Sequence, residues 1–226
     1  DQPAPFLRLD LVRTPQGFKV IDINLTRPAG LGDYLTLDHL YKRLGSAHQF
    51  PTGEVFSGTV RNCFEQWMEY RGSYGKARIA ILLAETAGDW HNFQALATAL
   101  REQTWVDSVD VVATVKAITD GDYNCVIRGR VKFGHPQFIQ LLALPTDRFC
   151  VISPLGWRFL GNKYWFVALR DPALRGLFAK RLSERELAIL DRAIPETGVL
   201  SGNMVVFPDR TVPLSSLTRK EWVLKP

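Results

Sequence analysis

The apolar segment at residues 79–84 is the feature of this sequence that most constrains the fold. Its six residues, IAILLA, carry no polar side chain and stand between Arg78 and Glu85. An uninterrupted apolar run of this length is typical of a strand buried on both faces of a parallel sheet. It is far shorter than the roughly 20 residues that cross a bilayer as a helix. We therefore expect an α/β fold and no association with a membrane.

The residues after this strand continue the same pattern. Asp89 is suited to cap a helix over the following residues, which carry an apolar face, and 109–113 and 123–127 read as further strands. A helix over 136–144 and a short strand over 149–152 complete the series. The alternation of strands and helices predicts a Rossmann-like parallel unit. GxGxxG and the P-loop motif are both missing from it, so a dinucleotide or Walker-type site is not expected.

The flanking segments define the domain organisation that the sequence predicts. Residues 6–12 and 18–24 read as a hairpin, 45–58 (GSAHQFPTGEVFSG) as a turn-rich boundary, and 218–226 as the start of another strand. Helical patterns occupy 33–44, 60–70 and most of 158–193. We expect three parts: a hairpin with one helix (1–45), the Rossmann-like domain (46–152) and a helical connector leading into a new strand (153–226).

The hairpin sequence FLRLDLVRTPQGFKVIDIN places carboxylates within strands, at Asp10 and Asp22. A four-residue connection would pair Asp10 with Ile21 and mix polar and apolar side chains on each face. A three-residue loop over 15–17 instead places the polar side chains on one face and the apolar side chains on the other. Gly17 then stands at the position that needs a left-handed residue, so we predict this register. It pairs Asp10 with Asp22, Arg8 with Asn24, Leu9 with Ile23, and Val12 with Val20.

Two carboxylates directly opposite each other repel, and a cation between them would relieve the repulsion. Asp10, Asp22 and Asn24 together offer three oxygen ligands, which suits Mg²⁺ with water and phosphate in its other positions. A solvated outer face, with Arg8 neutralising one carboxylate, explains the same residues without a metal. The hairpin alone leaves both interpretations open.

Charge and composition limit the class of ligand and the compartment. The net charge is +5 and the isoelectric point about 9.2, which is explained either by an ordinary basic surface or by an anionic ligand such as ATP. Nucleic acid is not expected, because no Lys/Arg run exceeds two residues and no RNP-like or helix-turn-helix signature occurs. The four histidines lack zinc-ligand spacing. Three scattered cysteines and the absence of a charged-then-apolar leader predict reduced thiols in a cytoplasmic protein.

Several motifs together resemble the circularly permuted ATP-grasp family, which includes glutathionylspermidine-synthase-like ligases. R-L-D followed by D-I-N in the hairpin is similar to the acidic residue and E-x-N that hold magnesium there, with Asp22 in place of the usual Glu. ILLAETAGDWHNFQALATALRE (81–102) resembles the first strand and helix of the family's pre-ATP-grasp domain. SPLGWRFLGNKYWFVAL (153–169), IPETGVL (194–200) and EWVLKP (221–226) resemble later segments of the family in the permuted order.

The resemblance implies an ATP- and Mg²⁺-dependent carboxylate-amine ligase that works through an acyl phosphate. Its substrates would be small-molecule or peptide carboxylates and amines. Lys225 would contact the nucleotide, and Lys163 could also face it; a solvated strand-end lysine and a helix-surface lysine are the alternatives. The family's glycine-rich loop follows the strand that ends at Lys225, so we expect this chain to hold an incomplete catalytic half.

Four more residues are candidates for substrate contact or catalysis. Arg128 stands at the carboxyl end of a predicted parallel strand, where open α/β sheets bind ligands, and Arg130 follows two residues on; surface salt bridges explain both almost as well. Arg27 in TRPAG could meet an anionic substrate or the transferring phosphoryl group, and Gly30 could let the backbone approach a ligand. A plain turn into the next helix is the alternative for both.

Two other classes of function compete with the ligase. One is a non-catalytic ATP-grasp-like binding or interaction module, which the replacement of Glu by Asp22 and the missing glycine-rich loop both favour. The other is an unrelated Rossmann-like domain that binds a small anion.

Overall fold

The computed structural model of the protein describes residues 8–24, 31–45, 52–84, 90–129, 131, 134–152, 163–218 and 222. The chain forms two compact units. We call residues 25–158, with 1–7, the sheet unit, and residues 8–24 with 159–226 the hairpin unit. The hairpin thus belongs to the same unit as the C-terminal segment, and the first helix belongs to the same unit as the sheet. The predicted division into three consecutive parts did not include this grouping.

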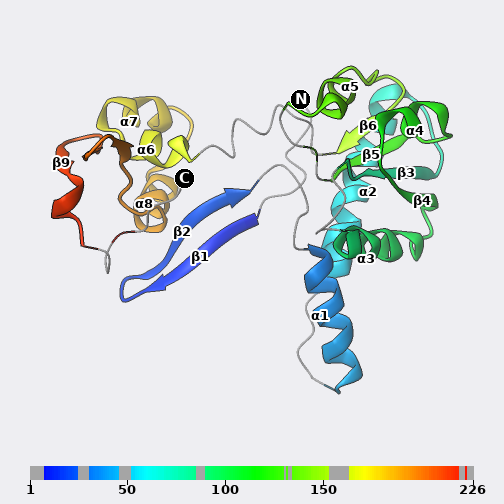
Figure 1. The fold of residues 1–226 in the computed structure, drawn as a ribbon, viewed down its shortest axis with the longest axis horizontal. Coiled ribbons are helices and arrows are strands. Elements are labelled where there is room, and N and C mark those ends of the chain that lie inside the picture. The colour runs from blue at the N-terminus through cyan, green and yellow to red at the C-terminus, as the bar shows by residue number, and fades with distance from the viewer. Residues whose placement is uncertain are drawn as a thin grey trace. The chain divides into compact units, whose positions relative to one another are not determined.

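The sheet unit holds nine described elements (Figure 1). They are α1 (Leu31–Arg43), α2 (Thr52–Arg71), β3 (Ala77–Leu82), α3 (Trp90–Arg101), β4 (Val106–Val112), α4 (Val115–Asp120), β5 (Cys125–Arg128), α5 (Pro136–Leu142) and β6 (Cys150–Ile152). The four strands are parallel in the order β4-β3-β5-β6, which confirms the predicted α/β class and parallel sheet.

Strand β3 is the central strand of the sheet, and its burial on both faces accounts for its apolar sequence. Ile79 and Ile81 pack into a core with α2 and α3, while Ala80 and Leu82 face a second core with α4 and α5. All four side chains are fully buried. Helices therefore cover both faces of the sheet, and no position in the middle of β3 reaches water.

Helix α2 corrects the predicted boundary at 45–58. It begins at Thr52, so the second half of that segment is helical. Two glycines and two threonines make 52–59 a weak helix by intrinsic propensity. Phe56 is 1% exposed in the core, and tertiary burial of such an apolar face contributes most of the stability of a helix in a protein.

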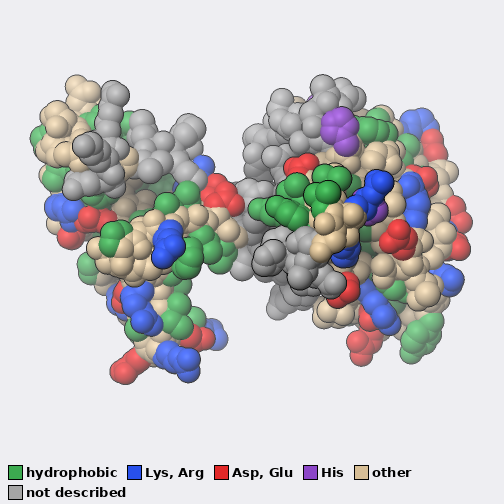
Figure 2. All heavy atoms as spheres, turned by 90° about the horizontal axis from the view of Figure 1, so that it is seen from below, with side chains coloured by type: hydrophobic (Ala, Val, Ile, Leu, Met, Phe, Trp, Pro, Cys, Tyr) green, Lys and Arg blue, Asp and Glu red, His purple; other side chains and the backbone are tan. Residues whose placement is uncertain are grey.

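Helix α1 carries an apolar side that the described part of the unit leaves uncovered. Leu31 and Leu35 pack against the core, whereas other large apolar side chains of the helix and its end are exposed. They are Tyr34, Leu37, Leu40, Tyr41 and Leu44. Figure 2 views the molecule from the side of the C-terminal end of α1 and shows hydrophobic side chains at the surface there.

The hairpin unit contains an antiparallel pair, three helices and a small sheet. Its elements are β1 (Arg8–Thr14), β2 (Gly17–Asn24), α6 (Tyr164–Arg170), α7 (Pro172–Ala179), α8 (Glu184–Ala193), β7 (Val199–Ser201), β8 (Met204–Val206), β9 (Thr211–Pro213) and a 3₁₀ turn (Leu214–Ser216). Strand β2 contacts α8. The antiparallel sheet β7-β8-β9 was not predicted, because strands of three residues are too short to show a period of two.

Side-chain hydrogen bonds hold the three helices of this unit together. Arg175 binds Asp191 of α8 through two bonds, of 2.9 and 2.6 Å. Arg170 Nη2 donates to the carbonyl oxygens of Asp191 and Ile194, at 3.0 and 2.6 Å, and so satisfies the C-terminal end of α8. Within the described ranges, no helix has the length and apolar character to cross a membrane.

Candidate functional site

The hairpin brings Asp10 and Asp22 together as predicted. Asp10 pairs with Asp22, Leu9 with Ile23, and Arg8 with Asn24 in the antiparallel register. Residues directly opposite in such a pair project from the same face, with their Cβ atoms about 5 Å apart. Two carboxylates therefore lie side by side on one face of the hairpin.

Nearer the turn, the predicted register is wrong. The turn contains two residues, Pro15 and Gln16, rather than three, and Val12 pairs with Lys19 rather than with Val20. A bulge at Ile21 supplies the offset that restores the Asp10–Asp22 pair. Gly17 has a φ of +109°, so its backbone is in the region that favours glycine, as expected for this loop.

The bulge changes which side chains share the acidic face. Opposite partners place Lys19 and Val12 on the face of Asp10 and Asp22, and the apolar face gains Val20. Lys19 Nζ donates to the carbonyl oxygen of Arg192 in α8 (2.5 Å). The sequence did not single out Lys19 because the bulge that moves it to this face leaves no mark in the residue pattern.

The two faces of the hairpin differ in exposure. Asp10 and Asp22 are half-buried. On the opposite face, Leu11 is 53% and Phe18 64% exposed. The two carboxylates are thus better shielded from water than these two apolar side chains.

The donor set of the acidic face fits a hard cation such as Mg²⁺. Asp22 Oδ1 accepts from the backbone N–H of Ile23 (3.0 Å), which orients that carboxylate. Mg²⁺ is commonly held by one or two carboxylates and completes its shell with water and phosphate oxygens. Among the described residues, no three His, Cys, Asp or Glu side chains form a metal-binding group, so the pair alone does not make a closed protein cage.

Lys163 lies in the same compact unit as the hairpin. It occupies the position before the first residue of α6, with φ −63° and ψ −18°, and its side chain makes no capping hydrogen bond. Lys163 is half-buried, which is compatible both with a lysine on a helix surface and with one that faces a ligand. No contact between Lys163 and the two aspartates follows from this position.

Arg128 belongs to the sheet unit and lies at the carboxyl end of β5. It pairs with Leu82 of β3 and, by alternation with Val126, projects on the α4/α5 side of the sheet. In the sheet, β4 lies on one side of β3, and β5 and β6 lie on the other. The direction in which strands are added therefore reverses between β3 and β5. Open α/β sheets bind ligands at this point. Arg128 is 4% exposed, so it is a buried residue and not a surface one.

Gly129 was not predicted to matter at this edge, but it makes a close backbone contact. Its N–H donates to the carbonyl oxygen of Leu82 (2.9 Å). A Cβ at this position would lie 2.4 Å from that oxygen and 3.3 Å from the ring of Phe93. The sequence alone does not show why a glycine follows this strand. The close contact with Leu82 and Phe93 identifies the reason, because a larger residue would clash there.

Four predicted site residues lie outside the described residues: Arg27, Gly30, Arg130 and Lys225. The side chain of Asn24 does too, although its backbone pairs with Arg8. Of the predicted set, the structure brings together Asp10 and Asp22 and assigns Arg128 to the other compact unit.

The sequence matched no protein-family model and no curated protein in comparisons with known proteins.

Proposed function

We propose that this chain is part of an ATP- and Mg²⁺-dependent carboxylate-amine ligase of the circularly permuted ATP-grasp type. In this proposal the hairpin belongs to the ATP-grasp core, and the sheet unit is the Rossmann-like pre-ATP-grasp domain. The observation that carries it is the pairing of Asp10 directly opposite Asp22, with Asn24 two residues further along β2. Two carboxylates directly opposite each other on a hairpin provide oxygen ligands that a divalent cation can share.

In the proposed reaction, Asp10, Asp22 and Asn24 would hold Mg²⁺ beside the phosphates of ATP. Bound there, the metal would neutralise phosphate charge and orient the γ-phosphoryl group. A substrate carboxylate attacks the γ-phosphorus, ADP leaves, and the resulting acyl phosphate carries an activated carbonyl. A substrate amine then attacks that carbonyl, phosphate leaves, and an amide is formed. Lys225 and Lys163 would contact the nucleotide, and Arg27 the transferring phosphoryl group.

The carboxyl edge of the parallel sheet supports a place for the substrate in this proposal. Arg128 is buried at the strand-order reversal and supplies a fixed positive charge, which suits a carboxylate substrate. Arg130 and Gly30 belong to the same proposed substrate site.

A metal-binding measurement tests the acidic pair without requiring turnover. Mn²⁺ replaces Mg²⁺ as a paramagnetic probe, and its binding with ATP is followed by electron paramagnetic resonance for the wild-type chain, Asp10→Asn and Asp22→Asn. Removing a carboxylate ligand should weaken metal–nucleotide binding by about tenfold or more. Glu184→Gln, which removes an exposed carboxylate from α8 in the same unit, serves as the matched control and should leave binding unchanged.

Equal affinity in the wild type and in both aspartate variants would refute the hairpin as the metal site. The non-catalytic module remains the second candidate, because Asp22 has a shorter arm than the Glu of the family pattern. Binding of Mn²⁺–ATP that depends on Asp10 and Asp22, without ADP release from mixtures of carboxylates and amines by the full-length protein, would favour that module.

A further inference from the structure

A pocket lies at the amino-terminal edge of the parallel sheet, the edge opposite Arg128. It has a volume of about 380 Å³. Its walls come from the last turn of α2, the turn that leads into β3, and the residues just before β5 and β6. This volume lies in the range of small-molecule sites, and the proposed ligase chemistry makes no use of this edge.

The end of α2 gives the pocket a defined wall. Gly72 has a φ of +61°, and its N–H donates to the carbonyl oxygen of Glu69 (3.0 Å). The N–H of Ser73 donates to the carbonyl oxygen of Met68 (3.1 Å). Together these bonds form a Schellman motif, which ends the helix and sets the direction of the chain into the pocket.

Two hydrogen bonds of the Asn124 side chain fix the opposite wall. Asn124 Oδ1 accepts from the backbone N–H of Arg78 (2.8 Å), and Asn124 Nδ2 donates to the carbonyl oxygen of Lys76 (3.1 Å). The side chain of Asn124 thereby ties the backbone before β5 to the start of β3. Lys76 and Arg78 therefore extend from a backbone that is held in place before any ligand arrives.

The pocket carries an excess of positive charge. Arg78 is neutralised by Asp122 (3.0 Å), and Asp147 supplies one further carboxylate at the rim. Counting both carboxylates, the four cations leave two net positive charges. Neither Arg71 nor Lys76 has an ion pair within the described part of the chain. The four cations that line the pocket are Arg71, Lys76, Arg78 and Arg148.

Two of the guanidinium groups are oriented by aromatic rings. Arg71 lies over the ring of Trp67, 5.1 Å from its centroid, and Arg148 lies over the ring of Phe149 at 4.7 Å. Arg148 Nη2 also donates to the carbonyl oxygen of Thr119 (3.0 Å). These contacts reduce the conformational entropy that the side chains lose when an anion binds.

We propose that this pocket binds the phosphate group of a small phosphorylated molecule. The cations that line the pocket come from α2, from the start of β3 with the residue before it, and from the segment before β6, so an anion bound there has donors on several sides. A tetrahedral phosphate dianion accepts from several directions at once, whereas a planar carboxylate accepts mainly in its own plane. The exposed rim, which includes Tyr74, leaves room for the rest of the molecule.

Binding of inorganic pyrophosphate to the whole chain tests this site. The titration is made at low ionic strength with EDTA and without divalent metal, so the proposed metal site on the hairpin does not contribute. The readout is the indole N–H resonance of Trp67, a residue that lines the pocket and donates to the carbonyl oxygen of Thr146 (2.9 Å). We expect a saturable shift, and about tenfold weaker binding in Lys76→Ala. Lys76 is exposed, so this variant should fold normally.

Two control variants make the result specific. Lys116→Ala removes an exposed cation of α4 in the same unit and should leave pyrophosphate affinity unchanged. Asp10→Asn alters the other unit and should also leave pyrophosphate affinity unchanged. A negative result for this pocket would therefore be distinguishable from a negative result for the proposed metal site. Equal weakening in Lys76→Ala and Lys116→Ala would show a general charge effect and overturn the site.

Two further ligands test the chemical class. Citrate binding as tightly as pyrophosphate would overturn the assignment to phosphate. A single-stranded oligonucleotide that binds more tightly than pyrophosphate, with a salt dependence that corresponds to several phosphates, would overturn the assignment to a small molecule. No saturable response to pyrophosphate in the wild-type chain would refute the site altogether.

Discussion

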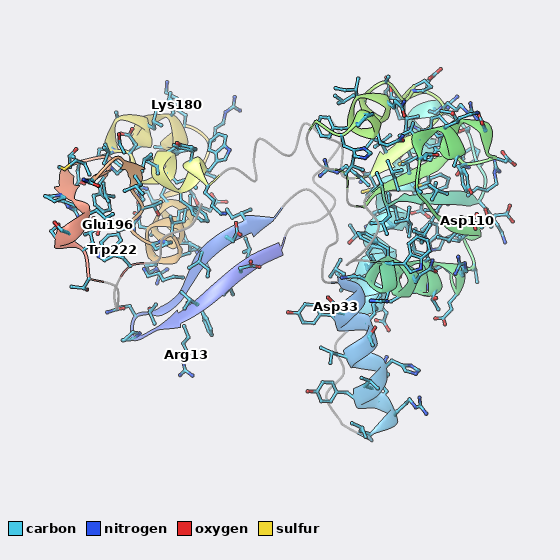
Figure 3. All side chains as sticks on the ribbon, in the orientation of Figure 1. Arg13, Asp33, Asp110, Lys180, Glu196 and Trp222 are labelled. Atoms are coloured by element: carbon cyan, nitrogen blue, oxygen red, sulfur yellow. The ribbon has the colours of Figure 1, made fainter. Side chains whose placement is uncertain are left out.

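Substitution of Asn92 by alanine should release the N-terminal end of α1 from the sheet unit. Asn92 belongs to α3 and is 7% exposed. Its Oδ1 accepts from the backbone N–H of Gly32 (2.7 Å), and its Nδ2 donates to Asp33 Oδ2 (3.1 Å). The first N–H groups of a helix have no partner within that helix, so Asn92 acts as a cap supplied by a different helix. Figure 3 shows Asp33 at the end of α1 that adjoins α3.

The magnitude follows from the two bonds. Leaving the buried N–H of Gly32 unsatisfied costs about 1–3 kcal/mol, and losing the partly exposed bond to Asp33 costs about 1 kcal/mol more. We therefore expect Asn92→Ala to destabilise the docking of α1 by about 2–4 kcal/mol. Relaxation into the space left by the side chain cannot restore these bonds, because alanine offers neither a donor nor an acceptor.

Amide hydrogen exchange is the suitable assay because the chain has two compact units and its unfolding is not expected to be a single transition. The free energy of opening should fall for amides of α1, while amides of α8 in the other unit should keep their protection. Asn92→Asp keeps an acceptor for Gly32 but sets a carboxylate beside Asp33. It should therefore destabilise α1, and Asp33→Asn in that background should restore protection.

A loss in α1 smaller than about 1 kcal/mol in Asn92→Ala would refute the reasoning, because a buried N–H without a partner costs more than that. Equal loss of protection in α1 and α8 would also contradict it, since the hydrogen bonds of Asn92 join α1 to α3 and do not involve the hairpin unit.

Two other predictions concern titratable groups. Hydrogen bonds from Ser183 lower the pKa of Glu186, so their stabilising effect is present above the ordinary pKa of Glu186 and is lost as the pH falls through the lowered value. Ser183→Ala should therefore lower the thermal stability of the hairpin unit at neutral pH, with a smaller difference from wild type in acid; a difference independent of pH would contradict this. Burial raises the pKa of Cys63 to about 11, and a hydrogen bond with Cys150 together with burial raises the pKa of Cys125. We expect iodoacetamide to modify these thiols slowly in the native protein and rapidly in denaturant, as measured by mass spectrometry; equal rates would contradict the burial of Cys125 and the partial burial of Cys63.

Much of the local architecture was predictable because it depends on neighbours in the chain. The hairpin, α3, β4, α5 and β6 lie within a few residues of their predicted positions. Helix α2 was predicted too short at its start, since Phe56 stabilises that turn only by packing into the core. Short α4 was missed, although Thr114 accepts from the N–H of Ala117 and provides a capping signal.

The candidate sites were predictable to a lesser degree. The separation of polar and apolar residues in the hairpin favoured Asp10 opposite Asp22, but not the bulge at Ile21 that maintains this pair beside a two-residue turn. The basic pocket at the other edge of the sheet could not be predicted, because its residues extend from Trp67 to Arg148 and join only when β3, β5 and β6 align.

The sequence by itself determined that a strand over 79–84 must be buried on both faces, because six consecutive apolar residues cannot alternate between core and water. It also determined that the carboxylates of the hairpin share a face with each other and not with Leu9, because pairing fixes the alternation of side chains. Tertiary structure alone decided that Asn92 caps α1 and that Lys76 and Arg148 line one pocket. Those contacts join residues far apart in the chain, and their free energy appears only once the two cores on either side of the sheet have formed.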